Sequence, residues 1–524
     1  MRKYRKNLLL LCSICVLFAA VSGCQAKESA DNKVQETTTV SLESEQAKNA
    51  GKEAGNHTAV FCDQTSVSIE GDGVSEDGGI ITITSAGTYR FEGTLTEGRI
   101  VVDAAKEDTI ILELNGFEIT SSDLSAIYGI KSGEIRLKLM DGTVNKVTDG
   151  TEYVLEEGED EPDAAIFSKG DLIIEGSGSL EVTGNYSDGI RSKDNLNILS
   201  GEITVTAKED GMKGKDSLVV DGGTITVHAG DDGIKSKGAV IINDGSIQVA
   251  ESYEGIEALT IDINGGTVDI TSADDGLNAV EDTADTSENG RRQGNFAVTE
   301  NAYIRVSGGT VLINASADGI DSNGHFYVDG GELYISGPTS GGDGALDYNG
   351  NGIITGGVVI AAGSSGMAQT FSEGSEQNSI LVYFENTQTA GTEIAVTDAS
   401  GNVIASYAPI KEYSSAVISA PGLETDGTYK ITAGEEIQEV TITDVLTTSG
   451  TKAAGAMPGG RRGQGGQRGD GFQGDPELDG RPAVNPEMMP DNQDFLPSQN
   501  QEGQSTEKDR RPGGRGIERE NSKE

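Results

Sequence analysis

The chain has 524 residues, of which 85 are acidic and 39 are basic, so its formal net charge is −46. This excess of carboxylates argues against a nucleic-acid partner, because phosphate binding needs clustered Lys and Arg. Hydrophobic residues make up only 35%, Trp is absent and Gly reaches 73 residues; the apolar core must therefore be thin or repetitive, and the chain must contain many turns.

The N-terminus has the pattern of an export signal. Four basic residues precede an apolar run over residues 8–20, which is the length of a signal-peptide core. The segment 21–24 then resembles a bacterial lipobox ending in Cys24, which would carry the lipid; an ordinary signal peptide with a nearby cut is the alternative. We expect a signal peptide over residues 1–23 and a lipid anchor on Cys24, whose two acyl chains hold the protein at the extracellular face of the cell membrane.

The segment that follows is rich in Lys, Glu, Ser and Thr, and we predict a flexible spacer over residues 24–60. Cys12 and Cys15 lie within the expected signal peptide, so with Cys24 lipidated Cys62 would be the only thiol left and no intramolecular disulfide could form. Residues 1–23 carry four basic and no acidic residues and residues 451–524 carry 11 basic and 13 acidic ones, which leaves a net charge of about −48 in residues 24–450.

An acid-Gly-apolar triplet recurs through the middle of the chain at steps of 22, 22, 22, 21, 43 and 25 residues. The long step is one period plus an insertion over residues 281–300. A Gly-Gly-Thr-Ile type of motif recurs out of phase with it, at residues 222–227, 265–270 and 308–313. Each period therefore holds three β-like segments separated by Gly, Asn or Asp turns.

A repeat of this size cannot bury its own apolar face, so its copies must stack. We predict an all-β fold, a right-handed parallel β-helix of about 22 residues per coil over residues 61–370, with less regular first coils over residues 61–150. Its inward columns include Ile190, Met212, Ile234, Ile256, Leu277 and Ile320. A leucine-rich repeat shares the period but lacks the Leu-x-x-Leu-x-Leu pattern, and the regular step argues against an aqueous barrel.

The period is lost after residue 370, although strand-like runs continue. We predict a β-rich C-terminal cap over residues 371–447, because the last coil of a solenoid otherwise exposes a strand edge. Residues 448–524 are rich in Gly, Pro and Arg and poor in apolar residues, which predicts a disordered tail.

Stacking would place the triplet acids in a column about 4.8 Å apart. Adjacent carboxylates at that spacing repel by roughly 3.5 kcal/mol at an effective dielectric of 20, and bound Ca²⁺ would relieve this repulsion. The best spots are Asp274 and Asp275 with Asn278, and Asp318 with Asp321 and Asn323. The full set of candidate calcium ligands is Asp188, Asp210, Asp231, Asp232, Glu254, Asp274, Asp275, Asn278, Asp318, Asp321, Asn323 and Asp343. The alternative is that each Asp-Gly is only a turn signal with a solvated carboxylate.

A basic strip runs beside the first half of this column, and it consists of Arg191, Lys193, Lys213, Lys215, Lys235 and Lys237. Next to bound Ca²⁺ these residues would hold the carboxylates of a uronic-acid polymer; the alternative is that they only compensate the charge of the acids. Tyr186 and Tyr253 precede two of the triplets, where they would either stack on sugar rings or pack on neighbouring loops. The absence of Trp argues against a broad aromatic platform for crystalline cellulose.

Several motifs together resemble one bacterial family. They are residues 87–93, residues 114–119, and residues 164–168 followed by 172–178, together with the repeated Asp-Gly-Ile and Gly-Gly-Thr-Ile motifs. The family is the carbohydrate-binding domain of clostridial surface proteins, formerly a domain of unknown function, and the resemblance covers roughly residues 61–445. It implies a parallel β-helix similar to pectate lyases, Ca²⁺ between coils, and binding of cellulose-like and acidic glycans. Glu254 and Ala345 depart from the repeat pattern.

Our leading hypothesis is a lipid-anchored, calcium-stabilised protein that binds acidic or cellulose-like polysaccharide without cleaving it, as a monomer. The first alternative is a calcium-dependent lyase acting on uronic-acid polymers, in which Lys213 or Lys235 would be the general base. The second is an adhesive surface solenoid whose partner is a protein. The sequence has no signature of nucleophilic or zinc hydrolysis: it lacks Gly-x-Ser-x-Gly, His-Glu-x-x-His and a P-loop.

Overall fold

The computed structural model describes residues 56–155, 158–281 and 297–452, and within these ranges the chain forms 41 strands and no helix. The fold is therefore all-β, as predicted, and no described segment is a helix long and apolar enough to cross a membrane. The predicted signal peptide, Cys24 and the residues beyond 452 lie outside the described residues. The first strand already begins at Asn56, inside the range predicted as a spacer.

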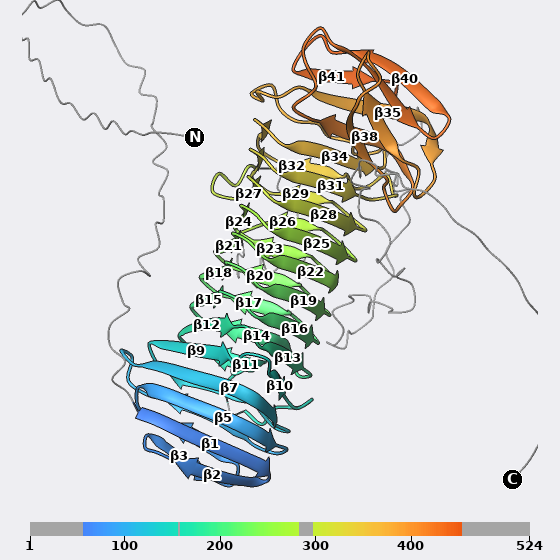
Figure 1. The fold of residues 1–524 in the computed structure, drawn as a ribbon. Helices are drawn as coiled ribbons and strands as arrows, with labels where there is room; N and C mark the ends of the chain where they lie inside the picture. The colour runs from blue at the N-terminus through green and yellow to red at the C-terminus, as the bar shows by residue number, and fades with distance from the viewer. Residues whose placement is uncertain (1–55, 156–157, 282–296, 453–524) are drawn as a thin grey trace, which may run out of the picture. The chain divides into compact units, whose positions relative to one another are not determined.

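Sheet B contains twelve strands (Figure 1). Its first pair is antiparallel, and every later pairing in it is parallel. The strands are β3 (Val74–Asp77), β4 (Ile80–Ile83), β6 (Arg99–Asp103), β8 (Ile127–Lys131), β11 (Ala164–Ser168), β14 (Asp188–Ser192), β17 (Met212–Gly214), β20 (Ile234–Ser236), β23 (Ile256–Ala258), β26 (Leu277–Ala279), β29 (Ile320–Ser322) and β32 (Leu346–Tyr348).

Sheet A contains 25 strands, most of them in two parallel rows. The first row is β9 (Glu134–Leu139), β12 (Asp171–Gly176), β15 (Asn195–Ile198), β18 (Ser217–Val220), β21 (Ala239–Ile242), β24 (Thr260–Ile263), β27 (Tyr303–Val306), β30 (His325–Val328) and β33 (Gly352–Ile354). The second row is β10 (Val144–Thr148), β13 (Ser179–Gly184), β16 (Glu202–Ala207), β19 (Thr224–Ala229), β22 (Ser246–Glu251), β25 (Thr267–Ser272), β28 (Thr310–Ala315), β31 (Glu332–Ser336) and β34 (Val358–Gly363). The remaining strands of sheet A are β1 (Asn56–Gln64), β2 (Ser66–Glu70), β5 (Gly87–Leu95), β7 (Thr109–Thr120), β35 (Ser379–Gln388), β38 (Tyr413–Ser419) and β41 (Leu446–Ser449).

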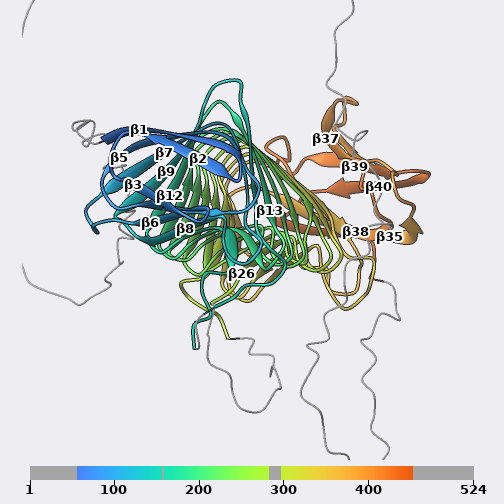
Figure 2. The same ribbon diagram turned by 90° about the horizontal axis from the view of Figure 1, so that it is seen from below.

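Each repeat contributes one strand to sheet B and then one to each row of sheet A, and successive repeats pair in register (Figure 2). In sheet B, Ile190 pairs with Met212 and Met212 with Ile234, a step of 22 residues. Leu277 pairs with Ile320 across the step of 43 residues. The insertion therefore leaves the register of the strands on either side of it unchanged.

The apolar core follows the predicted columns. Ile190, Met212, Ile234, Ile256, Leu277 and Ile320 are all fully buried, as are the alternating residues of the two rows of sheet A. In β16, for example, exposed and buried residues alternate along the whole strand, as expected when one face of a strand packs inward. Cys62 is a buried free thiol in the same core.

The glycine of each triplet is required by close packing between repeats. A Cβ placed on Gly233 would lie 2.5 Å from Val249 Cγ1 and 2.7 Å from the carbonyl oxygen of Gly255 in the next repeat. Gly211 and Gly276 have equivalent backbone neighbours. The Asp-Gly pair is thus more than a turn signal, because any side chain at the second position would push two repeats apart.

The C-terminal strands form a second apolar cluster and pair with the end of the parallel stack. Sheet C has four antiparallel strands, β36 (Ile394–Thr397), β37 (Val403–Tyr407), β39 (Thr428–Ala433) and β40 (Glu436–Thr441). In sheet A, β38 runs antiparallel to β34, with Ile360 opposite Ile418. This pairing satisfies the edge of β34 and stops the addition of further parallel strands.

A Gly233→Ala substitution tests the packing argument. We expect it to lower the free energy of unfolding by about 1–3 kcal/mol, because overpacking a tight core costs about that much. Thr224→Ala, at an exposed position of β19, should stay within about 0.5 kcal/mol of the parent. Urea unfolding followed by circular dichroism gives both values, and an unchanged midpoint for Gly233→Ala would contradict the packing argument.

Candidate functional site

The triplet acids lie just before or at the start of the sheet B strands, and four of them are deeply buried, whereas Glu254, Asp318 and Asp343 are partly exposed. Asp188, Asp210 and Asp232 are only 1%, 3% and 2% exposed, and Asp275 is 9% exposed. A carboxylate buried to this degree must be paired or hydrogen-bonded to remain charged. Each buried carboxylate oxygen therefore needs a hydrogen-bond donor or a positive charge nearby.

One carboxylate oxygen of most triplet acids holds the backbone of the next repeat. Asp188 Oδ1 accepts a hydrogen bond from the N–H of Asp210 at 3.1 Å, and Asp210 Oδ1 accepts one from Asp232 at 3.1 Å. In later repeats Asp275 Oδ1 accepts from the N–H of Asp318 at 2.8 Å, and Asp318 Oδ1 from that of Gly344 at 2.6 Å. The acid is therefore a structural link between neighbouring repeats as well as a charge.

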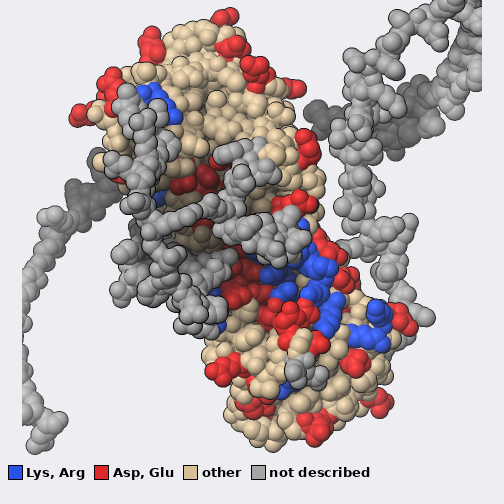
Figure 3. All heavy atoms as spheres, turned by 180° about the vertical axis from the view of Figure 1, so that it is seen from behind, with Lys and Arg blue, Asp and Glu red and all other residues tan. Residues whose placement is uncertain are grey.

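In the first half of the column, the second oxygen is neutralised by a base three residues later. Lys213 Nζ lies 2.5 Å from Asp210 Oδ2 and 3.7 Å from Asp188 Oδ2. Lys235 pairs in the same way with Asp232, and it also lies 2.7 Å from Glu257 Oε1. Figure 3 shows a face on which Lys and Arg side chains gather directly beside Asp and Glu side chains. This geometry is the charge compensation that was the alternative to glycan binding.

The ion pairs outweigh the effect of burial on these lysines. Burial acts to lower the pKa of Lys213, but the negative charges of Asp210 and Asp188 more than compensate and raise it above its ordinary value. The pKa of Lys235 is raised by the same balance, with Asp232 as its main partner. Both amines therefore carry a positive charge at neutral pH.

The outer members of the basic strip also have protein partners. Arg191 pairs with Asp163 and lies 3.5 Å from Asp188 Oδ2, and Lys193 pairs with Glu161. Asp163 and Glu161 come from the segment before β11, and the sequence analysis did not assign them a role because they fall outside the repeat pattern.

The remaining candidate ligand residues of this region are also engaged. Lys215 lies 3.6 Å from Asp216 Oδ1 in an exposed pair, and Lys237 and Tyr253 make interactions of their own. Tyr186 stacks on Tyr153 with ring centroids 4.0 Å apart and an angle of 9°. Tyr186 thus packs on a neighbouring loop, which was the second of the two roles considered for it.

The second half of the column lacks the bases. The position occupied by Lys235 becomes Glu257, Asn278, Asp321 and Asp347 in the next four repeats, which lie in register. Oxygen atoms of Asp275, Asp318 and Asp321 all lie within 4.8 Å of one another. These three carboxylates, with Asn278, are called the acidic cluster below.

Asn278 supplies an independent sign that the acidic cluster is built for a cation. Its side chain is only 7% exposed, and its Oδ1 atom has no hydrogen-bond partner among the described residues. Its Nδ2 atom donates to Glu254 Oε2 at 2.9 Å, which fixes the amide so that Oδ1 is the free atom. Asn278 stands in register with Asp321, and amide and carboxylate oxygens together are a donor set that hard divalent cations prefer.

The carboxylates of the acidic cluster are held in an unfavourable state without a cation. Burial, followed by repulsion from Asp321 and Asp318, raises the pKa of Asp275 to about 8. The pKa of Asp318 rises to about 7 and that of Asp321 to about 6, in each case first through burial and then through neighbouring carboxylates. Among the largest causes of these three shifts, the charged groups are all acids of the described residues, so a bound cation would relieve the repulsion.

Other predicted calcium ligands form overlapping groups in which carboxylate oxygens lie within 4.8 Å of one another. Asp231 lies with Asp210 and Asp232, and Asp274 lies with Glu254 and Asp275. Two members of the group that contains Asp231, Asp210 and Asp232, are already paired with Lys213 and Lys235. Asn323, in contrast, uses its Oδ1 atom to accept a hydrogen bond from Asn349 at 3.2 Å, so it extends a column of amides rather than the acidic cluster.

The sequence analysis placed Asp343 in the acid column, and the register corrects this. Ile320 pairs with Leu346, and the N–H of Gly319 bonds to the carbonyl of Gly344. The residue equivalent to Asp318 is therefore Gly344, one position after Asp343, and the step is 26 rather than 25 residues. Asp347 is the acid that stands in register with Asp321, and aligning the apolar residue Leu346 instead of the Asp-Gly pair would have found it.

A family model described as carbohydrate-binding domain-containing protein matches residues 77–344, about half of the chain. The chain belongs to this family. The resemblance drawn from the sequence motifs is thereby confirmed at the level of the family.

One relative of this carbohydrate-binding domain family is a carbohydrate-binding domain-containing protein of Acetivibrio thermocellus. It is 41% identical over 138 residues, which are 26% of this chain and 48% of the relative, so the match spans about half of that protein. A solved structure described as the polysaccharide lyase-like protein from C. thermocellum, a gadolinium derivative, is 25% identical. It covers 57% of this chain and 95% of its own, with a TM-score of 0.38.

The structural role of the first acids is tested by Asp210→Ala. This change leaves Lys213 without its nearest carboxylate and the N–H of Asp232 without an acceptor, so we expect a loss of about 2–5 kcal/mol in unfolding free energy. Asp216→Ala removes an acid of the same repeat from an exposed ion pair and should cost less than about 1 kcal/mol. If the two variants lower the unfolding free energy equally in urea, the buried pairing of Asp210 adds no more stability than an exposed ion pair does.

Proposed function

We propose that this chain is a calcium-dependent glycan-binding protein that does not cleave its ligand, and that its repeats form a right-handed parallel β-helix. The observation that carries the proposal is the acidic cluster, in which oxygen atoms of Asp275, Asp318 and Asp321 lie within 4.8 Å of one another. Asn278, whose Oδ1 has no partner among the described residues, stands in register with Asp321. Membership of the carbohydrate-binding domain family supports polysaccharide as the ligand. The in-register parallel pairing of three strands per repeat supports the β-helix.

We further propose that Ca²⁺ in the acidic cluster provides the link to acidic glycans. Ca²⁺ accepts six to eight oxygen ligands at irregular geometry, so three carboxylates and an amide leave positions for the carboxylate of a uronic acid. The basic strip contributes less than its sequence indicated, because Arg191, Lys213 and Lys235 are already paired with protein carboxylates. The half of the face that contains the acidic cluster and lacks these bases is therefore the better location for the glycan.

The attachment and location of the protein are part of the same proposal. The basic and apolar leader followed by Cys24 supports a lipid anchor at the extracellular face of the cell membrane, and we propose that the protein acts there as a monomer. A glycan-binding protein held there would retain polysaccharide close to the cell.

The lyase alternative is less well supported by the geometry. A general base must be able to accept a proton near neutral pH, whereas ion pairing raises the pKa of Lys213 and Lys235 above the ordinary lysine value. Each amine is also directed at a buried aspartate of its own repeat. These two lysines are therefore poorly suited to removing the α-proton of a uronate.

Calcium binding is tested with Asp321→Asn. In the parent protein, Ca²⁺ at 100 times its Kd should add about 2.7 kcal/mol to the unfolding free energy, measured as a rise in Tm. In the calcium-free state the variant should be as stable as the parent or more so, because the repulsion around Asp321 is reduced, but its response to Ca²⁺ should be lost. Asp216→Asn serves as the control, and an unchanged calcium response in Asp321→Asn would contradict the assignment.

One pull-down experiment on polygalacturonate distinguishes binding from cleavage, because retention and product formation are both measured. We expect the protein to be retained on insoluble polygalacturonate in Ca²⁺, to be released by EDTA, and to form no unsaturated uronate product during long incubation. Retention that is unchanged by EDTA would show that glycan binding does not depend on calcium. The appearance of unsaturated product would establish the lyase instead.

A further inference from the structure

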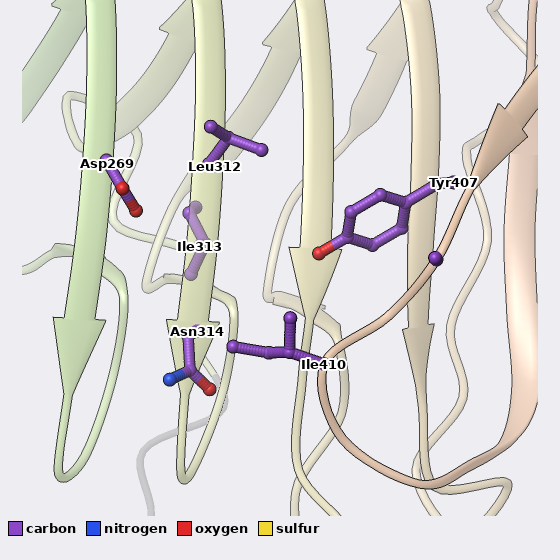
Figure 4. Close-up of a pocket in the computed structure, with 7 residues that line it drawn as sticks. Asp269, Leu312, Ile313, Asn314, Tyr407 and Ile410 are labelled. Carbon is purple, nitrogen blue, oxygen red and sulfur yellow. The ribbon is translucent and has the colours of Figure 1, made fainter. Parts of the chain in front are cut away.

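A pocket lies where the C-terminal strands meet the outer surface of the parallel stack, away from the acidic cluster. Its lining comes from β25, β28, the last residue of β37 and the segment that follows it (Figure 4). Pockets at such junctions between structural units are common ligand sites. The lining residues are Asp269, Leu312, Ile313, Asn314, Tyr407, Ala408 and Ile410.

Asp269 is the least expected residue of this lining. It points outward from β25 and pairs in register with Gln248 on one side and Leu312 on the other. Its carboxylate makes no hydrogen bond or ion pair with any described residue, and burial alone raises its pKa. A half-buried carboxylate without a partner costs stability, which indicates that it is kept for a ligand.

The other side of the pocket is apolar and rigidly held. The oxygen of Tyr407 lies 2.8 Å from Ser336 Oγ, and the ring stacks on Tyr334 with centroids 5.1 Å apart. Ser336 Oγ also accepts a hydrogen bond from the N–H of Ile410 at 3.0 Å. Figure 4 shows Asp269 at one side of the pocket and Tyr407 with Ile410 at the other, with Leu312 and Asn314 between them.

This combination matches the chemistry of an uncharged sugar ring. A carboxylate and an amide can bind adjacent hydroxyl groups through several hydrogen bonds, while Tyr407, Leu312 and Ile410 offer apolar surface to the C–H face of the ring. The lining contains no basic side chain, and the nearby Lys411 donates its Nζ hydrogen bond to the carbonyl of Ala315. The carboxylate of a uronic acid would therefore face Asp269 with no basic residue in the lining to compensate it.

We propose that this pocket is a second glycan subsite, which takes a neutral sugar residue without calcium, with Asp269 and Asn314 as its hydrogen-bonding groups. The proposal rests on the proposed glycan-binding function but concerns a different ligand class and a different face of the chain. It gives the protein two independent modes: a calcium-dependent one for acidic polymers and a calcium-independent one for neutral ones.

The test measures binding of soluble cellohexaose to the full chain by isothermal titration calorimetry in EDTA. The parent should bind, Asp269→Asn should weaken binding at least 10-fold, and Asn314→Ala should weaken it several-fold. Asp262→Asn is the matched control. Asp262 is also a half-buried outward carboxylate of the same repeat, but it already accepts a hydrogen bond from Tyr303 Oη at 2.8 Å, and its replacement should leave cellohexaose affinity within two-fold.

Two further readouts separate the possible outcomes. The Tm of Asp269→Asn should equal or exceed that of the parent, so that lost binding cannot be attributed to unfolding, and Asp321→Asn should keep cellohexaose binding while losing its calcium response. Retention on polygalacturonate in Ca²⁺ without any cellohexaose binding would overturn this subsite and leave the calcium-dependent function standing. Unchanged cellohexaose affinity in both Asp269→Asn and Asn314→Ala would likewise overturn the location.

Discussion

Parallel pairing in register is the constraint on which the rest of this structure depends. Because every strand of one repeat lies about 4.8 Å from its equivalent in the next, residues of one type recur as a column on the same face. For apolar residues such as Ile190, Met212 and Ile234 this is favourable, since they fill a continuous core. For aspartates the same geometry brings like charges close together, so each repeat needs a group that offsets their repulsion.

The repulsion between the aspartates is handled differently in the two halves of the acid column. In the early repeats a base three residues after the acid neutralises it, as Lys213 does for Asp210, and the result is a closed set of buried ion pairs. In the later repeats the position of the base holds Glu257, Asn278 and Asp321, and we propose that a bound cation offsets the negative charge there. A single substitution at one position of the repeat thus converts a structural ladder into a candidate binding site.

Most of the fold could be predicted from the sequence, because the period, the three β-like segments and the inward columns all follow from local patterns. The site was harder to predict. Repeat spacing located the acids, but it could not show that Arg191 and Lys193 are paired with Asp163 and Glu161, since those acids lie in a segment without the period. It also misplaced Asp343 by one residue, because the Asp-Gly pair there is out of phase with the strand pairing. The pocket beside Asp269 depends on the C-terminal strands folding back onto β28, a long-range contact that no local pattern contains.

The unchanged register across the 43-residue step has a consequence for how such a chain can vary in length. Leu277 and Ile320 pair as closely as neighbours separated by 22 residues do, so the extra segment leaves from and returns to a corner between strands without disturbing either sheet. Closing a loop of twice the length costs only about 0.6 kcal/mol more in chain entropy. The corner between sheet B and the first row of sheet A is therefore a place where new sequence can be accepted at small thermodynamic cost, while the strands on both sides keep the core intact.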